Sequence, residues 1–504
     1  MNMLTRKIPF LLLIAICLVF QSCSGMKTAR SAGSTSDPLI GSLIRVNVAG
    51  QGYNFHRPWN QGSPSTHTAI GVIVQGPRVL LTAQMIANHR YVELEKLETG
   101  RKGRAEVEVV DYEANLALLK AKDPDFLTDM RPLELTTEAV SGDLLTILQI
   151  KGNGNIAPSE SPITSIELAR QAFGGFFLTY RLNGSLQYRY NNATLPALKG
   201  RKLAGLLTGY DAKAQTIDIL SAPILSHFLK EATGENYRGF PRFGVRVVPT
   251  DDPQLRRYEG IPDDLEGVYV QQVARGSAGE KAGIKVGDII VEMAGYPVDR
   301  HGSYPHPLYG KVSLPHLIRC VFFAGDKIKV SVFRKGKTRE IEIVPEEIPV
   351  KDFLVPPYVV DTPPRYYILG GLVLQELSLS YLQEYGSQWL VKAPIGLVNY
   401  QKNQHAIDPG GREKIVFLSQ VLRTSQTIGY GSLTDLVVTR INHKAINKLE
   451  DVPRALETPV KGFHRVEFEE HPKVIYIDPA EIEGINRQIR QRYNLPALQN
   501  IAIK

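Results

Sequence analysis

Serine, histidine and cysteine are the side chains best able to do hydrolytic chemistry, and the sequence does not gather them into an evident catalytic set. His67 follows Ser63 and Ser65 near a predicted strand, and His89 lies beyond the next one, but neither histidine has a serine and an aspartate close in sequence. A serine attacks a carbonyl only when a base takes its proton and a carboxylate orients that base. We therefore interpret these residues as surface polar side chains, with a relocated active site as the alternative.

Metal-ligand spacing is absent as well. Four further histidines are too scattered for metal-ligand spacing, and no His-x-x-x-His pair occurs; they are His56, His301, His306 and His316. Of the three cysteines, Cys17 lies in an apolar N-terminal run, and Cys320 is the only one far from that end. A single cysteine forms neither an internal disulfide nor a cysteine zinc site. We predict no metal, no cofactor and a buried Cys320.

The elements that would position any site are mainly strands. The chain has 504 residues, 43 of them Gly and 32 Pro, which is too long for one core and suits two to four domains with many turns. Short Val-, Ile- and Tyr-rich runs continue to residue 220, and a helix over 221–234 follows them, capped by Ser221 and ended by Gly234. We expect a pair of small β-barrels over residues 38–234.

A repeated pattern follows the barrels. VGDIIVEMAGYPV (286–298) and LTDLVVTRINHKAI (433–446) look like two copies of one unit, in which an Asp precedes an apolar strand, a tight turn and a second short strand. We expect two related modules, over 235–348 and 349–504. The second ends in an amphipathic helix that carries Ile482, Ile485 and Ile489.

The stretch KAGIKVGDIIVEMAGYPV resembles the strand and turn signature of a PDZ domain. A β-barrel domain followed by two such modules resembles the HtrA/Deg family of Do-like serine proteases, from about Leu39 to the C-terminus. Within that family GFPRFGV and YYILGGLVLQELSLSYLQEYG are most similar to the branch with a divergent second PDZ domain, best known from plants. The resemblance implies a mainly β fold: a trypsin-like double β-barrel followed by two PDZ-like α+β domains.

The resemblance also assigns the three catalytic positions. The family histidine closes a strand of the type LLTNAH, and LLTAQM puts Met85 there. The family aspartate lies in a pattern of the type DxxxDLALLK, and DYEANLALLK puts Asn115 there. The serine of GNSGGPA falls on Ala193 of NNATLPA. The resemblance therefore implies that no catalytic residue remains.

Thioether, carboxamide and methyl groups cannot replace a base, an anion and a nucleophile. Removing a whole triad costs on the order of a millionfold in rate. The glycines that aim two backbone N–H groups at the oxyanion are also replaced, by Asn191, Thr194 and Leu195. The alternative is a working serine endopeptidase whose catalytic residues lie elsewhere.

The first PDZ-like module is the candidate binding site, because such domains add a C-terminal peptide to a sheet edge. Its predicted carboxylate loop is Phe243-Gly244-Val245, and Arg242 and Arg246 add a field that favours a carboxylate. A helix over 313–322 would form the other wall, with Leu314, Leu317 and Ile318 as contacts. The alternative is that Phe243 and Val245 are core residues and the groove is blocked.

The N-terminus resembles a bacterial lipoprotein signal. Arg6 and Lys7 precede the apolar run 9–20, and Ser22 stands directly before Cys23. We predict a signal peptide over 1–22, lipidation of Cys23, a tether over 23–37 and a place on the periplasmic side of a bacterial envelope. Simple cleavage and an uncleaved anchor are the alternatives.

The leading hypothesis is a non-catalytic family member that binds peptides or unfolded envelope proteins as a chaperone, a scaffold or a regulatory subunit of active Deg-type homologues. A structural envelope lipoprotein is a further alternative. The resemblance suggests a homotrimer. The formal net charge of +8 falls by two when Arg6 and Lys7 are removed, and no basic cluster with interleaved aromatics occurs, so no nucleic-acid partner is expected.

Overall fold

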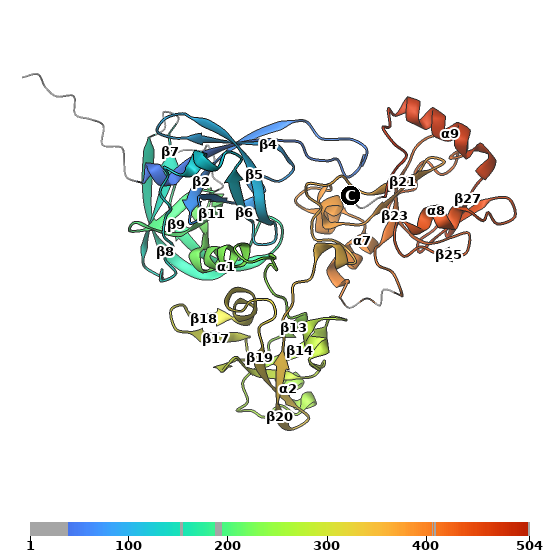
Figure 1. Ribbon diagram of the computed structural model, residues 1–504. Helices are drawn as coiled ribbons and strands as arrows, with labels where there is room; N and C mark the ends of the chain where they lie inside the picture. Colours follow the sequence, from blue (N-terminus) through green and yellow to red (C-terminus); the bar gives the residue numbers. More distant parts are fainter. Residues whose placement is uncertain (1–38, 152–154, 187–193, 406, 408–409, 502–504) are drawn as a thin grey trace, which may run out of the picture. The chain divides into compact units, whose positions relative to one another are not determined.

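The computed structural model describes residues 39–151, 155–186, 194–405, 407 and 410–501 (Figure 1). The predicted signal peptide, the tether and Cys23 lie outside these residues, as do Asn191 and Ala193. The chain divides into residues 1–37 and one compact unit from Pro38 to Lys504. Within the described ranges, no helix combines the length and the apolar character needed to cross a membrane.

The first barrel closes in the strand order β1-β2-β3-β6-β5-β4. Its inward side chains alternate with half-buried ones, as in β1, where Ile44, Val46 and Val48 are buried. Gly71 is required on β2, because a Cβ there would lie 2.2 Å from Val79 Cγ1. Its strands are β1 Leu43–Gly50, β2 Ser65–Val74, β3 Arg78–Leu81, β4 His89–Lys96, β5 Lys102–Asp111 and β6 Leu116–Ala121.

The second barrel closes in the order β10-β11-β12-β9-β8-β7. Helix α1, Ala222–Ala232, follows it and buries Ile224, Leu225 and Phe228. Ser221 stands at the N-cap but its side chain makes no capping hydrogen bond, and the C-cap is Thr233 rather than Gly234. The double barrel is confirmed. Its strands are β7 Leu144–Ile150, β8 Ile156–Arg170, β9 Phe176–Asn183, β10 Pro196–Lys199, β11 Lys202–Asp211 and β12 Thr216–Ser221.

The middle module is a twisted antiparallel sheet in the order β13-β14-β15-β19-β20, with β16 beside β15 and a separate β17–β18 hairpin. The helix expected over 313–322 begins as α4, Leu314–His316, and continues as a π-helical turn over Leu317–Val321. The other elements are β13 Val245–Val248, α2 Pro253–Glu259, β14 Val268–Val273, α3 Ala278–Lys281, β15 Ile289–Met293, β16 Tyr296–Pro297, β17 Ser303–His306, β18 Gly310–Ser313, β19 Ile328–Arg334 and β20 Lys337–Ile343.

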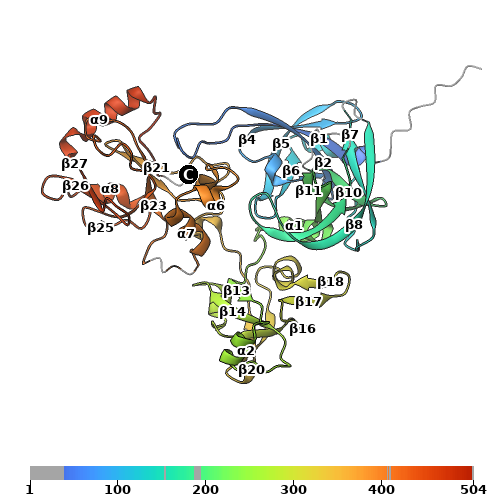
Figure 2. The same cartoon turned by 180° about the vertical axis from the view of Figure 1, so that it is seen from behind.

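The last module is a sheet in the order β27-β26-β24-β23-β22-β21-β28, with β25 beside β24. Helices cover both of its faces, because Leu372 and Leu374 pack in the cluster of α8 while Val373 packs in the cluster of α9 (Figure 2). Its strands are β21 Tyr366–Leu369, β22 Leu372–Glu376, β23 Val416–Val421, β24 Leu436–Ile441, β25 Lys444–Ala445, β26 His464–Phe468, β27 Val474–Ile477 and β28 Gln499–Asn500. Its helices are α5 Leu379–Gln383, α6 Trp389–Lys392, α7 Ile395–Asn403, α8 Asp451–Leu456 and α9 Pro479–Arg492.

Candidate functional site

Asn115 lies beside the turn that carries Met85. Met85 ends the short helical turn Ala83–Met85 that follows β3. Asn115 is fully buried in the β5–β6 turn with φ 58°, and its Oδ1 accepts the backbone N–H of Gln84 at 2.9 Å. Its carbonyl oxygen accepts the N–H of Ala83 at 3.1 Å. The carboxamide therefore holds the backbone of the Met85 turn.

Thr194 brings the third segment to the same place. The residue follows Ala193 directly, is fully buried and has φ 77°. Its hydroxyl accepts the backbone N–H of Thr82 at 3.1 Å and also contacts the Thr82 hydroxyl. Leu195 is the other described residue predicted to replace a glycine of the oxyanion turn. It is buried in a hydrophobic cluster that includes residues of both barrels. The described residues around the three assigned positions thus meet at one end of the first barrel.

No triad is recorded among the described residues. His89 Nδ1 bonds to the Ile86 carbonyl oxygen at 2.8 Å and lies 3.9 Å from Asp361 Oδ1, but no serine hydroxyl is bonded to this ring. Ser65 Oγ and His67 Nε2 are 3.2 Å apart on an exposed stretch of β2, and no carboxylate partner is recorded for His67. A serine–histidine pair without an orienting carboxylate lacks a group that nucleophilic catalysis needs.

Metal chemistry has no counterpart in the described part of the chain. Within those ranges, no group of three or more His, Cys, Asp or Glu side chains is placed to hold an ion. Cys320 is buried, and burial raises the pKa of its thiol to about 12, so the thiol stays protonated at neutral pH.

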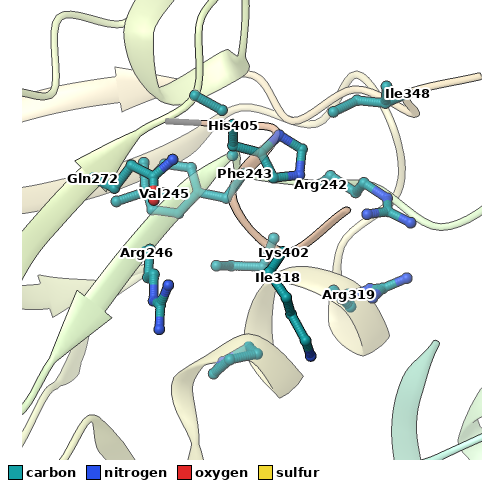
Figure 3. Close-up of a pocket in the computed structure, with 13 residues that line it drawn as sticks. Arg242, Phe243, Val245, Arg246, Gln272, Ile318, Arg319, Ile348, Lys402 and His405 are labelled. Atoms are coloured by element: carbon teal, nitrogen blue, oxygen red, sulfur yellow. The ribbon is translucent and has the colours of Figure 1, made fainter. Parts of the chain in front are cut away.

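A pocket of about 290 Å³ lies beside β13 of the middle module, and Lys402 and His405 of the last module also line it (Figure 3). The predicted loop Phe243-Gly244-Val245 lies on its wall together with Ile318. The charged groups on its wall are all basic. The full lining consists of Arg242, Phe243, Gly244, Val245, Arg246, Gln272, Ala274, Pro315, Ile318, Arg319, Ile348, Lys402 and His405.

The loop before β13 leaves backbone donors unused. The carbonyl oxygens of Phe243 and Gly244 accept the N–H groups of Gly279 at 3.0 Å and Ala274 at 2.8 Å, whereas no acceptor for the N–H of Phe243 or Gly244 is recorded within the described ranges. Gly244 has φ +72°, and a Cβ there would lie 2.2 Å from Ser277 Cβ. Only glycine fits this turn, which presents two N–H groups beside the pocket.

The opposite wall uses a different face from the one predicted. Ile318, Arg319 and Pro315 line the pocket, whereas Leu314 and Leu317 do not. Those two leucines are 2% and 1% exposed and belong to the core cluster. Pro315, Ile318 and Arg319 are spaced i, i+3 and i+4, so they share one helical face, which is offset by one residue from the predicted one.

Glu113 joins two arginines of the pocket to the first barrel. Arg242 donates to Glu113 Oε1 at 2.5 Å, and Arg319 Nη2 lies 2.5 Å from the same oxygen. Burial alone would raise the pKa of the Glu113 carboxyl, but the guanidinium groups of Arg319 and Arg242 outweigh it and hold that pKa below its usual value. Sequence reasoning missed Glu113 and Arg319, although a basic residue directly after Ile318 on the predicted wall was a usable signal.

Asp111 adds a second buried carboxyl beside this ion pair. Burial first, and then the neighbouring Glu113 carboxylate, raises the pKa of Asp111 above its usual value. The Tyr237 hydroxyl donates to Asp111 Oδ2 at 2.5 Å, and the Ala114 N–H donates to Oδ1 at 2.7 Å. The turn that carries Asn115 is thus fixed by buried polar contacts on both of its sides.

In the last module, the strand that matches β13 has no free edge. β22 follows the loop Leu369-Gly370-Gly371 as β13 follows Phe243-Gly244, but β22 pairs with β21 on one side and with β23 on the other. β21 in turn pairs with the C-terminal β28. By contrast, β13 stands at the end of its sheet and pairs only with β14 among the described strands. The middle module is therefore the candidate for strand addition.

Comparison with known proteins identifies the last two modules as PDZ domains. PDZ domain families match residues 241–344 and residues 355–499. The chain is similar to "Protease Do-like 4, mitochondrial" of Arabidopsis thaliana, with 22% identity over 468 residues that cover 92% of this chain and 86% of the relative. It is also similar to "Serine protease HTRA4" of Mus musculus, with 23% identity over 255 residues that cover 47% of this chain and 51% of the relative. A solved structure, "HtrA-type protease AlgW with decapeptide", covers 62% of this chain and 98% of its own, with 13% identity and a TM-score of 0.48.

Two closed six-stranded barrels followed by two PDZ domains define a trypsin-type protease architecture with C-terminal PDZ domains. The similarity to Do-like proteases extends over both the barrels and the PDZ domains. The resemblance to the HtrA/Deg family is confirmed by the two PDZ domains and by this similarity to Do-like proteases.

Proposed function

We propose that this family member works without catalysis and binds the C-terminal ends of peptides or unfolded proteins in the groove of its first PDZ domain. The observation that carries the proposal is the pair of unused N–H groups on Phe243 and Gly244, beside a pocket whose charged groups are all basic. A terminal carboxylate would accept from those N–H groups, and the peptide would add to the open edge of β13. Phe243, Val245 and Ile318 would surround the last side chain.

The absence of catalysis rests on the residue types at Met85, Asn115 and Ala193, the last of which lies outside the described residues. The contacts of Asn115 support this part of the proposal. Its Oδ1 binds a backbone N–H, where an orienting carboxylate would accept the N–H of an imidazole. Met85 offers no such ring.

Peptide titration tests the binding. A fluorescein-labelled peptide that ends in a free-acid valine should give saturable anisotropy with the purified protein, and its C-terminal amide should bind at least tenfold more weakly, since the amide removes the charge that the N–H groups recognise. Ile318→Glu should abolish binding because it places a carboxylate inside the groove. Val321→Glu is the matched control, since Val321 is 43% exposed on the same turn and does not line the pocket. Equal binding of acid and amide would refute the proposed mode.

The other readings predict different outcomes. A structural envelope lipoprotein with closed grooves binds no free-acid peptide, and an active endopeptidase shortens the peptide during the titration, which mass spectrometry detects.

We also propose lipidation of Cys23 and a periplasmic place on the bacterial envelope, because the N-terminal sequence resembles a bacterial lipoprotein signal. Retention in the membrane fraction that is lost in Cys23→Ser tests this proposal.

Unfolded envelope proteins and active Deg-type homologues are the partners that we propose, and a homotrimer is the proposed assembly. A free carboxyl-terminal end is what an unfolded client exposes, so the groove suits a chaperone, scaffold or regulatory subunit. Light scattering of the purified protein gives the assembly, and a monomeric mass would exclude the trimer.

A further inference from the structure

The basic side chains around the pocket differ in whether they already have an anionic partner. Arg242 and Arg319 share the buried Glu113 carboxylate, and their guanidinium groups also lie over aromatic rings, at 5.0 Å from Phe353 and 4.7 Å from Phe177. These two arginines already have a counter-ion.

Arg246 is different. It is exposed on β13, and within the described ranges it has no ion pair and no side-chain hydrogen bond. Its cross-strand neighbour on β14 is Gln272, which is uncharged. In Figure 3, Arg246 lies on one side of the pocket and the pair Arg242 and Arg319 on the other. Lys402 of α7 also lines the pocket without an ion pair in the described part of the chain, but Arg246 is the cation on β13 itself. The open edge of β13 therefore carries a cation that lacks an anionic partner.

The alternation of β13 tells which ligand residue would meet this cation. Val245 and Val247 pack against the core cluster, so Arg246 between them belongs to the opposite face of the strand. A peptide added antiparallel to β13, with its last residue beside Val245, places its next-to-last residue beside Arg246 on the same face. The last side chain enters the pocket and the next-to-last side chain lies over Arg246.

Building on the proposed binding of C-terminal peptides, we propose that Arg246 makes the groove selective for an acidic residue directly before an apolar C-terminal residue. The ligand class is therefore a peptide that ends in Asp or Glu followed by an aliphatic residue. An opposite-charge cross-strand pair would tighten binding about two- to fivefold, and a like-charge pair would weaken it by a similar factor.

Anisotropy titrations with the full chain test the selectivity. The probes are three fluorescein-labelled nonapeptides that end in Ala-Asp-Val, Ala-Ala-Val and Ala-Lys-Val, each as the free acid and as the amide. The wild type should bind the Asp peptide most tightly and the Lys peptide least tightly, and Arg246→Glu should reverse this order. Arg339→Glu is the control for net charge, because Arg339 is exposed on β20 in the same domain, away from the pocket, and should keep the wild-type order.

The outcomes separate this inference from the function on which it rests. Free-acid peptides that bind, with weak amides but one affinity for all three sequences, would overturn the selectivity and leave the proposed function standing. An order that persists in Arg246→Glu would also overturn it. If no free-acid peptide binds, both proposals fail together.

Discussion

Replacing Gly244 by alanine should destabilise the first PDZ domain far more than an ordinary Gly→Ala change in a turn. Gly244 has φ +72°, and the added Cβ would lie 2.2 Å from Ser277 Cβ and 2.7 Å from its Oγ. Gly276 is a matched control, because it has φ +71° in the same domain and its added Cβ meets nothing within 4 Å. The pair differs only in the close approach to Ser277.

The magnitudes follow from these two terms. A left-handed backbone costs an alanine about 1–2 kcal/mol at either position. The collision with Ser277 adds about 1–3 kcal/mol at Gly244 alone. We expect a loss of about 2–5 kcal/mol for Gly244→Ala and about 1–2 kcal/mol for Gly276→Ala. Entropic effects on the unfolded chain are shared and cancel in the difference.

Hydrogen exchange of peptides that cover β13 to β15 is a suitable assay, because backbone exchange reports the opening free energy of this region. Exchange there should be about 5- to 150-fold faster in Gly244→Ala than in Gly276→Ala. Ser277→Gly should recover most of the difference when it is added to Gly244→Ala. By itself it costs only a few tenths of a kcal/mol at the N-cap of α3. Equal exchange in the two alanine variants would refute the close approach and with it the loop geometry of the site.

Three further predictions concern buried groups. His227 is stacked between Phe240 and Phe323, and burial lowers its pKa to about 4, so the free energy of unfolding should be unaffected above pH 6.5 and fall by about 3 kcal/mol toward pH 4; a urea series followed by circular dichroism should show a shallower fall in His227→Phe. Glu113→Gln should cost about 3 kcal/mol, because it leaves two arginines without their buried counter-ion, whereas Glu134→Gln in an exposed ion pair should cost under about 1 kcal/mol in the same assay. Cys320 should resist iodoacetamide in the native protein at pH 8 and react after denaturation, as peptide mapping can show, and rapid native labelling would contradict its burial.

Much of the barrel fold could be predicted because its strands carry alternating apolar patterns. The apolar stretch 144–150 has the pattern of a strand and forms β7. The longest strand, β8, contains the polar stretch PSESPITS, which carries no strand pattern and owes its strand conformation to the ladders with β7 and β9. The closed strand order also depends on pairings between distant segments, which local patterns do not encode.

The sequence predicts the parts of the binding site that follow from residue type, and it does not predict the parts that depend on how distant segments pack. The Phe243-Gly244-Val245 loop could be placed from its resemblance to the hydrophobic-Gly-hydrophobic loop of PDZ domains, and it lies directly before β13. Of the predicted wall residues, Ile318 lines the pocket, whereas Leu314 and Leu317 are buried in the core, and the residue pattern alone did not decide which helical face meets the core. The ion pair of Arg242 with Glu113 joins positions 129 residues apart, and no local sequence pattern predicts such a contact.

The central claim is that the trypsin-type domain has lost its chemistry while the first PDZ domain keeps its binding edge. The most direct measurement is fluorophosphonate labelling of the purified protein, followed by intact-mass analysis, in the presence of casein and of the free-acid valine peptide. The account predicts no covalent adduct and no casein fragments, with or without the peptide. An adduct on a serine, at a stoichiometry that further purification does not lower, would contradict it.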